Sequence, residues 1–138
     1  MRRTALGLRL LLGAVLFATA AGKLADVRGF AGVLRAYGAF PEASLLPLAA
    51  AIPVVELALA LWLFSGRGLE GAALGALVLH VAYAAWAALS LARGLRLENC
   101  GCFGVFLARP LGWRTVAEDL TLAASAAALL AVSLRRAS

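Results

Sequence analysis

Four long apolar stretches constrain the fold of this chain more than any other feature. They cover residues 5–22, 45–64, 71–92 and 116–134. Each has close to the roughly 20 residues that cross the hydrocarbon core of a bilayer as a helix. Soluble domains distribute their apolar residues by helical or strand period and seldom in such runs. The sequence therefore predicts an all-α integral membrane protein, with one domain folded as a bundle of four transmembrane helices in the lipid bilayer.

The first apolar stretch also has the features of a secretory signal peptide. It follows a basic start at residues 2–3, and the small residues 18–20 fit a cleavage site. Arg9 lies inside the stretch, where its long side chain can reach the near membrane interface, as suits a retained helix. We expect this helix to be retained.

The positive charge of the chain lies beside the apolar stretches. The net charge is +6, and twelve of the thirteen Lys and Arg residues lie between or beside the apolar stretches, as is typical of membrane proteins. This placement argues against a nucleic-acid partner. Six of the cationic residues fall on the side of the termini and seven on the other, so their number does not decide the orientation. The basic start of the first helix favours cytoplasmic termini in the cell (inner) membrane.

Three further segments have recognisable local patterns. Residues 24–44 are amphipathic and too charged to span a bilayer, so we expect a continuation of the first helix and then a segment on the membrane surface. Gly71 and Gly75 have the spacing of a close helix contact. Thr115 and Glu118 fit a capping box at the start of the fourth helix, with Asp119 beside them. We interpret both carboxylates as capping groups.

The only two cysteines, Cys100 and Cys102, are separated by one glycine in the polar loop before the fourth helix. A disulfide between them would close a very small loop and stabilise the fold little. Exposed or strained disulfides exchange readily, so this pair indicates redox chemistry. With cytoplasmic termini, the pair would lie on the extracytoplasmic face, where disulfides persist.

Two other uses of the cysteines stay open. A Cys-x-Cys pair can bind a soft ion such as Cu(I), which would make the chain a soft-metal relay or a small transporter. His80 is remote from the loop and Met1 is the only methionine, so we expect no stable metal site. The third interpretation is a membrane scaffold with a passive disulfide.

Glu56 and His80 are ionisable residues within the second and third apolar stretches. At the helical rise, Glu56 lies roughly 16 Å from one membrane face and His80 roughly 13 Å from the opposite face. In a hydrocarbon core about 30 Å thick, the two residues are therefore at nearly the same depth. Such residues usually face the bundle interior, and Tyr83 follows His80 by one turn. They are candidates for a quinone-binding or other polar site; the alternative is a polar pair that fixes helix packing.

The Cys-Gly-Cys-Phe-Gly string at residues 100–104, with residues 21–24 and 53–56, resembles the MauE family within the DoxX-like superfamily. The resemblance implies a four-helix membrane protein that exchanges thiols and disulfides with a thioredoxin-like partner, as in maturation of methylamine dehydrogenase. We therefore predict a membrane thiol–disulfide oxidoreductase with Cys100 and Cys102 as its catalytic residues. A quinone or a second protein would carry the electrons, and the spacing does not show which cysteine attacks.

Overall fold

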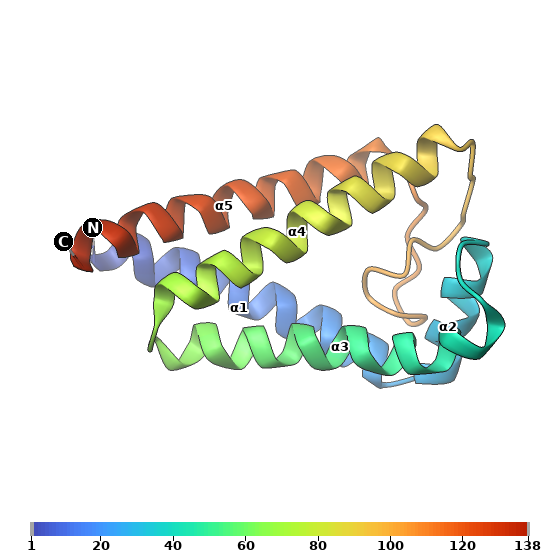
Figure 1. Cartoon of the computed structure of the whole chain (residues 1–138), viewed down its shortest axis with the longest axis horizontal. Helices are drawn as coiled ribbons and strands as arrows, with labels where there is room; N and C mark the ends of the chain where they lie inside the picture. The colour runs from blue at the N-terminus through green and yellow to red at the C-terminus, as the bar shows by residue number, and fades with distance from the viewer. Residues whose placement is uncertain (1, 138) are drawn as a thin grey trace.

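The computed structural model describes residues 2–137 of the chain as five helices joined by loops (Figure 1). The helices are α1 (Arg2–Leu24), α2 (Val27–Ala36), α3 (Glu42–Ser65), α4 (Leu69–Ala92) and α5 (Trp113–Ala137). Four of them, all but α2, are long and apolar enough to span a membrane. The prediction of an all-α, multi-pass membrane protein is confirmed.

The four long helices form two pairs. α1 packs along α3, and α4 packs along α5. Figure 1 shows the two pairs close together at the end that holds both termini and further apart at the opposite end. There the loop between α4 and α5 turns back between the pairs, and α2 lies beside it. The cysteine loop and the termini are therefore at opposite ends of the bundle.

The terminal end has a tight apolar core. Its fully buried side chains are leucines on α1, α3 and α5 and alanines on α3, α4 and α5: Leu12, Leu16, Ala60, Leu63, Ala72, Ala73, Ala76, Ala126 and Leu129. A Cβ atom at Gly71 would lie 2.9 Å from the Trp62 ring, and one at Gly75 would lie 2.7 Å from Leu59 Cδ2. At both glycines a side chain of α3, and not its backbone, comes close to α4.

The segment after the first span differs from expectation. α1 does not continue through it but ends at Leu24, because Asp26 starts a new helix by accepting a hydrogen bond from the Gly29 N–H at 2.8 Å. The apolar face of α2 then packs against α3 within the protein. The buried side chains of that face are Phe30, Ala31 and Leu34.

The predicted capping box is also corrected. α5 begins at Trp113, so Thr115 is already inside the helix; its Oγ1 accepts a hydrogen bond from the Gly112 N–H at 3.4 Å. Glu118 binds two arginines, with Oε1 2.6 Å from Arg109 Nη2 and 3.0 Å from Arg114 Nε. Because α5 begins two residues before Thr115, Glu118 does not occupy the third helical position that a capping box requires, and it pairs with the two arginines instead.

Candidate functional site: a thiol pair above a buried polar network

The cysteine loop is held in place by its own backbone and by α2. The Cys100 N–H donates to the Arg109 carbonyl at 2.7 Å, and the Leu111 N–H donates to the Leu97 carbonyl at 2.9 Å, so the loop folds back on itself. The Tyr37 hydroxyl on α2 donates to the Cys100 carbonyl at 2.7 Å. These bonds fix the backbone on both sides of the first cysteine.

Two glycines dock the loop onto the end of α1. A Cβ atom at Gly22 would lie 2.2 Å from the Phe103 carbonyl oxygen, and one at Gly104 would lie 2.3 Å from the Gly22 carbonyl oxygen. Gly104 also has φ +74°, a conformation that glycine adopts without steric cost. The backbones can touch only because both side chains are absent. Residues 21–24 and 100–104, which are distant in the sequence, thus meet in the fold.

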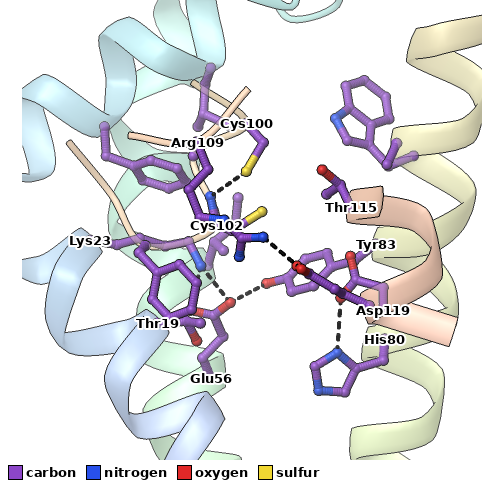
Figure 2. A pocket seen from close by; sticks show the side chains of 18 of the residues that line it. Thr19, Lys23, Glu56, His80, Tyr83, Cys100, Cys102, Arg109, Thr115 and Asp119 are labelled. Atoms are coloured by element: carbon purple, nitrogen blue, oxygen red, sulfur yellow. Dashed lines mark hydrogen bonds and ion pairs between the residues drawn. The ribbon is translucent and has the colours of Figure 1, made fainter. Parts of the chain in front are cut away.

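Both thiols are free and half-buried, and Figure 2 shows them on one side of a pocket. The Cys102 N–H lies 3.4 Å from Cys100 Sγ. The hydrogen bond from the Cys102 thiol is the main cause that lowers the pKa of Cys100 to about 7; the Cys102 N–H and the Arg109 guanidinium add to it, against the opposing effect of burial. The pKa of Cys102 is raised by its bond to Cys100 and by burial. Cys100 is therefore the thiolate-forming member of the pair.

The pocket beside the thiols has a volume of about 230 Å³ and is lined mainly by apolar and aromatic side chains from every helix and from the cysteine loop. Its aromatic lining consists of Phe30, Tyr37, Phe40, Tyr83, Trp86 and Phe103. The rings of Phe40 and Trp86 stack with their centroids 5.3 Å apart. The cavity thus brings a thiol pair and an aromatic wall together between the helix pairs.

A buried ion pair crosses the bundle below Cys102. Lys23 Nζ on α1 lies 2.7 and 2.9 Å from the two carboxylate oxygens of Glu56 on α3. The Tyr83 hydroxyl on α4 donates to the same carboxylate at 2.6 Å (Figure 2). Lys23 is 4% exposed and Glu56 is fully buried. The network ties three spans together and satisfies the Glu56 carboxylate with two donors.

A second polar pair joins α4 to α5. His80 Nδ1 lies 3.1 Å from Asp119 Oδ1, and His80 is 3% exposed. Asp119 is thus a partner of a buried histidine and not the helix-capping group that the sequence indicated. The prediction that Glu56 and His80 face the bundle interior is confirmed, and both line the same cavity. Their roles in a quinone or other polar site stay predictions.

Sequence reasoning missed four side chains of this site. Lys23, Tyr37, Arg109 and Asp119 all line the cavity. The sequence pattern places Lys23 among the cations beside the spans. Lys23 also belongs to residues 21–24, one of the segments in which the chain resembles the MauE family. Tyr37 and Arg109 lie outside the apolar stretches and had no recognisable signal. Among the described residues, no group of three or more His, Cys, Asp or Glu side chains could hold a metal ion.

These features define a multi-pass membrane protein that carries a pair of unequal thiols above buried polar groups. The family model described as "Methylamine utilisation protein MauE" matches residues 1–132, and the chain belongs to this family. A MauE protein of Paracoccus denitrificans is 35% identical over 122 residues, which cover 88% of this chain and 66% of that protein. A MauE protein of Paracoccus versutus is 36% identical over 121 residues, which cover 85% and 65%.

The chain spans about two thirds of the length of these curated relatives. A comparison with solved structures gives no significant match.

Proposed function

We propose that this protein is a membrane thiol–disulfide exchange component for methylamine utilisation, and that it works with a thioredoxin-like partner. The observation that carries the proposal is the inequality of the two neighbouring thiols, because exchange needs one thiolate to attack and a second thiol to resolve. The names of the family and of its two Paracoccus relatives supply the physiological context. The resemblance implies maturation of methylamine dehydrogenase as the client process.

The exchange proceeds in two balanced steps. The Cys100 thiolate attacks one sulfur of the partner's disulfide, a mixed disulfide forms, and the partner's other sulfur leaves as a thiolate. Cys102 then gives up its proton to that thiolate and attacks Cys100 Sγ, which releases the partner's first sulfur. The chain's two cysteines are oxidised to a disulfide, and the partner's disulfide is reduced to one thiol and one thiolate. The thiolate takes up from solvent the proton that Cys100 released on ionising. The reverse sequence oxidises the partner.

Trapping tests this proposal. Cys102→Ser keeps the attacking thiolate and removes the resolving thiol, so a mixed disulfide with an oxidised thioredoxin-like protein should accumulate. Cys100→Ser should trap little, and Cys100→Ser with Cys102→Ser is the matched control that should trap none. Non-reducing electrophoresis followed by mass spectrometry identifies the adduct. The proposal is wrong if neither single variant captures the partner and the double variant supports the full pathway.

The soft-metal relay makes a different prediction for the same proteins. The reduced wild-type chain would bind Cu(I) stoichiometrically, and the double serine variant would not. Such binding without any mixed disulfide in the trapping assay would replace the exchange mechanism by metal transfer.

We also propose that the termini are cytoplasmic and that the cysteine loop faces the extracytoplasmic side of the cell (inner) membrane. The basic residues 2–3 before the first span support this orientation, and the termini and the loop lie at opposite ends of the bundle (Figure 1). A membrane-impermeant thiol reagent should label Cys100 in intact cells. Labelling only after lysis, with access to the outer face verified by a control protein, would reverse the orientation.

A further inference from the structure

The cavity below the thiols is large enough for a small ligand. An apolar cavity of about 150 Å³ is enough to bind benzene. The volume here, about 230 Å³, therefore accommodates one substituted six-membered ring. The stacked Phe40 and Trp86 rings form one wall, and both cysteines line the same space. A planar ring bound there would lie within the same enclosure as the thiolate of Cys100.

One residue that lines the cavity has a buried polar atom without a partner. Glu56 is satisfied by Lys23 and Tyr83, but His80 Nε2 is buried without a hydrogen bond. Among the described buried side-chain nitrogen and oxygen atoms without partners, it alone belongs to a residue of this cavity. A buried polar atom that stays unpaired costs free energy, so a ligand that pairs with it gains that free energy.

The contact with Asp119 determines what this nitrogen offers to a ligand. Because the carboxylate accepts from His80 Nδ1–H, neutral His80 has Nε2 as an acceptor, while protonated His80 has Nε2–H as a donor. The donor form pairs with a carbonyl oxygen, and the acceptor form pairs with a hydroxyl group. These are the oxygen groups of a quinone and of its reduced hydroquinone.

We propose that this cavity binds the ring of a membrane quinone beside His80, and that the quinone oxidises the Cys100–Cys102 dithiol. The inference rests on the thiol pair of the proposed function and adds the electron acceptor. A lipid-soluble carrier fits because four spans surround the site and its lining is mainly apolar. The two oxygens of the quinone distinguish it from an acyl chain, which would leave His80 Nε2 unpaired.

The redox step balances within this site. The Cys100 thiolate attacks a ring carbon and forms a sulfur–carbon bond. Cys102 then attacks Cys100 Sγ, so that the disulfide forms, the sulfur–carbon bond breaks and its electron pair returns to the ring. The quinone gains two electrons and takes up two protons, equal in number to those lost by the two thiols. The products are one hydroquinone and one Cys100–Cys102 disulfide.

Binding is measured without chemistry in the Cys100→Ser, Cys102→Ser protein in nanodiscs. The probe is a dimethoxy-methyl-benzoquinone with a short alkyl tail, and its binding is followed by quenching of tryptophan fluorescence. His80→Phe in this background keeps a ring and removes the polar nitrogens, so we expect Kd to rise about tenfold. Val78→Ala on the same helix, at a 60% exposed position, is the matched control and should leave Kd unchanged.

Turnover is measured with the reduced wild-type protein and the same quinone. One quinone should be reduced per chain, with an equal amount of the Cys100–Cys102 disulfide found by mass spectrometry. Equal Kd values for His80→Phe and its parent would overturn the quinone site alone. So would the absence of quinone reduction by the wild-type protein while Cys102→Ser still traps the thioredoxin-like partner. Saturable binding that depends on His80 in the double serine background, together with no partner trapped by Cys102→Ser, would support the site and overturn the exchange function instead.

Discussion

The two ends of the bundle satisfy different physical requirements. At the terminal end, leucines such as Leu12, Leu16 and Leu63 pack against alanines of α4, and Arg9 lines a separate pocket beside them. At the cysteine end, the helix pairs separate, and the space between them holds Lys23, Glu56 and the cavity. In lipid, small residues allow helices to approach and pack by van der Waals contact. Buried charges instead cost free energy and must be paired.

The terminal end of the bundle contributes mainly to stability, and the cysteine end carries the chemically reactive groups. The leucine and alanine side chains of the apolar cluster can be close-packed because none of them carries a polar group that must be paired. The polar end keeps a cavity and reactive thiols, so its side chains are arranged by hydrogen bonds and ion pairs. We therefore expect substitutions at the two ends to change different measurable properties.

The largest expected effect is at the buried ion pair. Lys23→Met leaves the Glu56 carboxylate buried with Tyr83 as its remaining partner, and breaking a buried pair in this way costs about 3–5 kcal/mol. Adding Glu56→Gln removes the unpaired charge and should restore most of the loss. The free energy of unfolding, measured by denaturant titration in micelles, checks both. A Lys23→Met protein as stable as the wild type would show that Glu56 does not need Lys23 as a partner.

The next effect is at the apolar end. Leu63→Ala removes a fully buried side chain and should lower the free energy of unfolding by about 2–5 kcal/mol. Leu61→Ala, at a neighbouring position that is 55% exposed, is the control and should change it by less than about 0.5 kcal/mol. The alkylation rate of Cys100 should be the same in both variants. A slower or faster rate in Leu63→Ala would show that the two ends are coupled.

A smaller effect is expected where the loop docks on α1. In Gly22→Ala the new methyl group would overlap the Phe103 carbonyl, so we expect overpacking to cost about 1–3 kcal/mol and partner trapping by Cys102→Ser to slow. Gly7→Ala in the same helix meets no atom within 4 Å and is the matched control. It should stabilise the protein by about 0.4–1 kcal/mol. Equal trapping rates would mean that the glycine contact does not position the thiols.

The smallest expected effect is the response of Cys100 to pH. Because its pKa is lowered to about 7, the thiolate forms as the pH rises through 7, and its alkylation rate should increase about tenfold from pH 6 to pH 8 and then level off. Arg109→Gln removes a charge that favours the thiolate and should move the midpoint upward. Arg96→Gln, at an exposed position of the same loop, should not. A rate that continues to rise to pH 10 would contradict the lowered pKa.

The four spans were predictable because a bilayer imposes a minimum apolar length, which residue order alone reveals. The interior positions of Glu56 and His80 followed from the cost of exposing an ionisable group to lipid. The side chains that pair with Glu56 and His80 could not be predicted from this cost. Asp119 has the local pattern of a capping residue, and only the packing of α4 against α5 brings it to His80.

Sequence alone determined the all-α membrane class, the four spans and the thiol pair, because each depends on local composition or spacing. The tertiary structure decided that Lys23 pairs with Glu56, that Gly22 touches Gly104, and that Cys100 is the thiolate-forming cysteine. Such contacts join residues from different helices and loops, and their energies depend on distance and burial. No local pattern specifies either quantity.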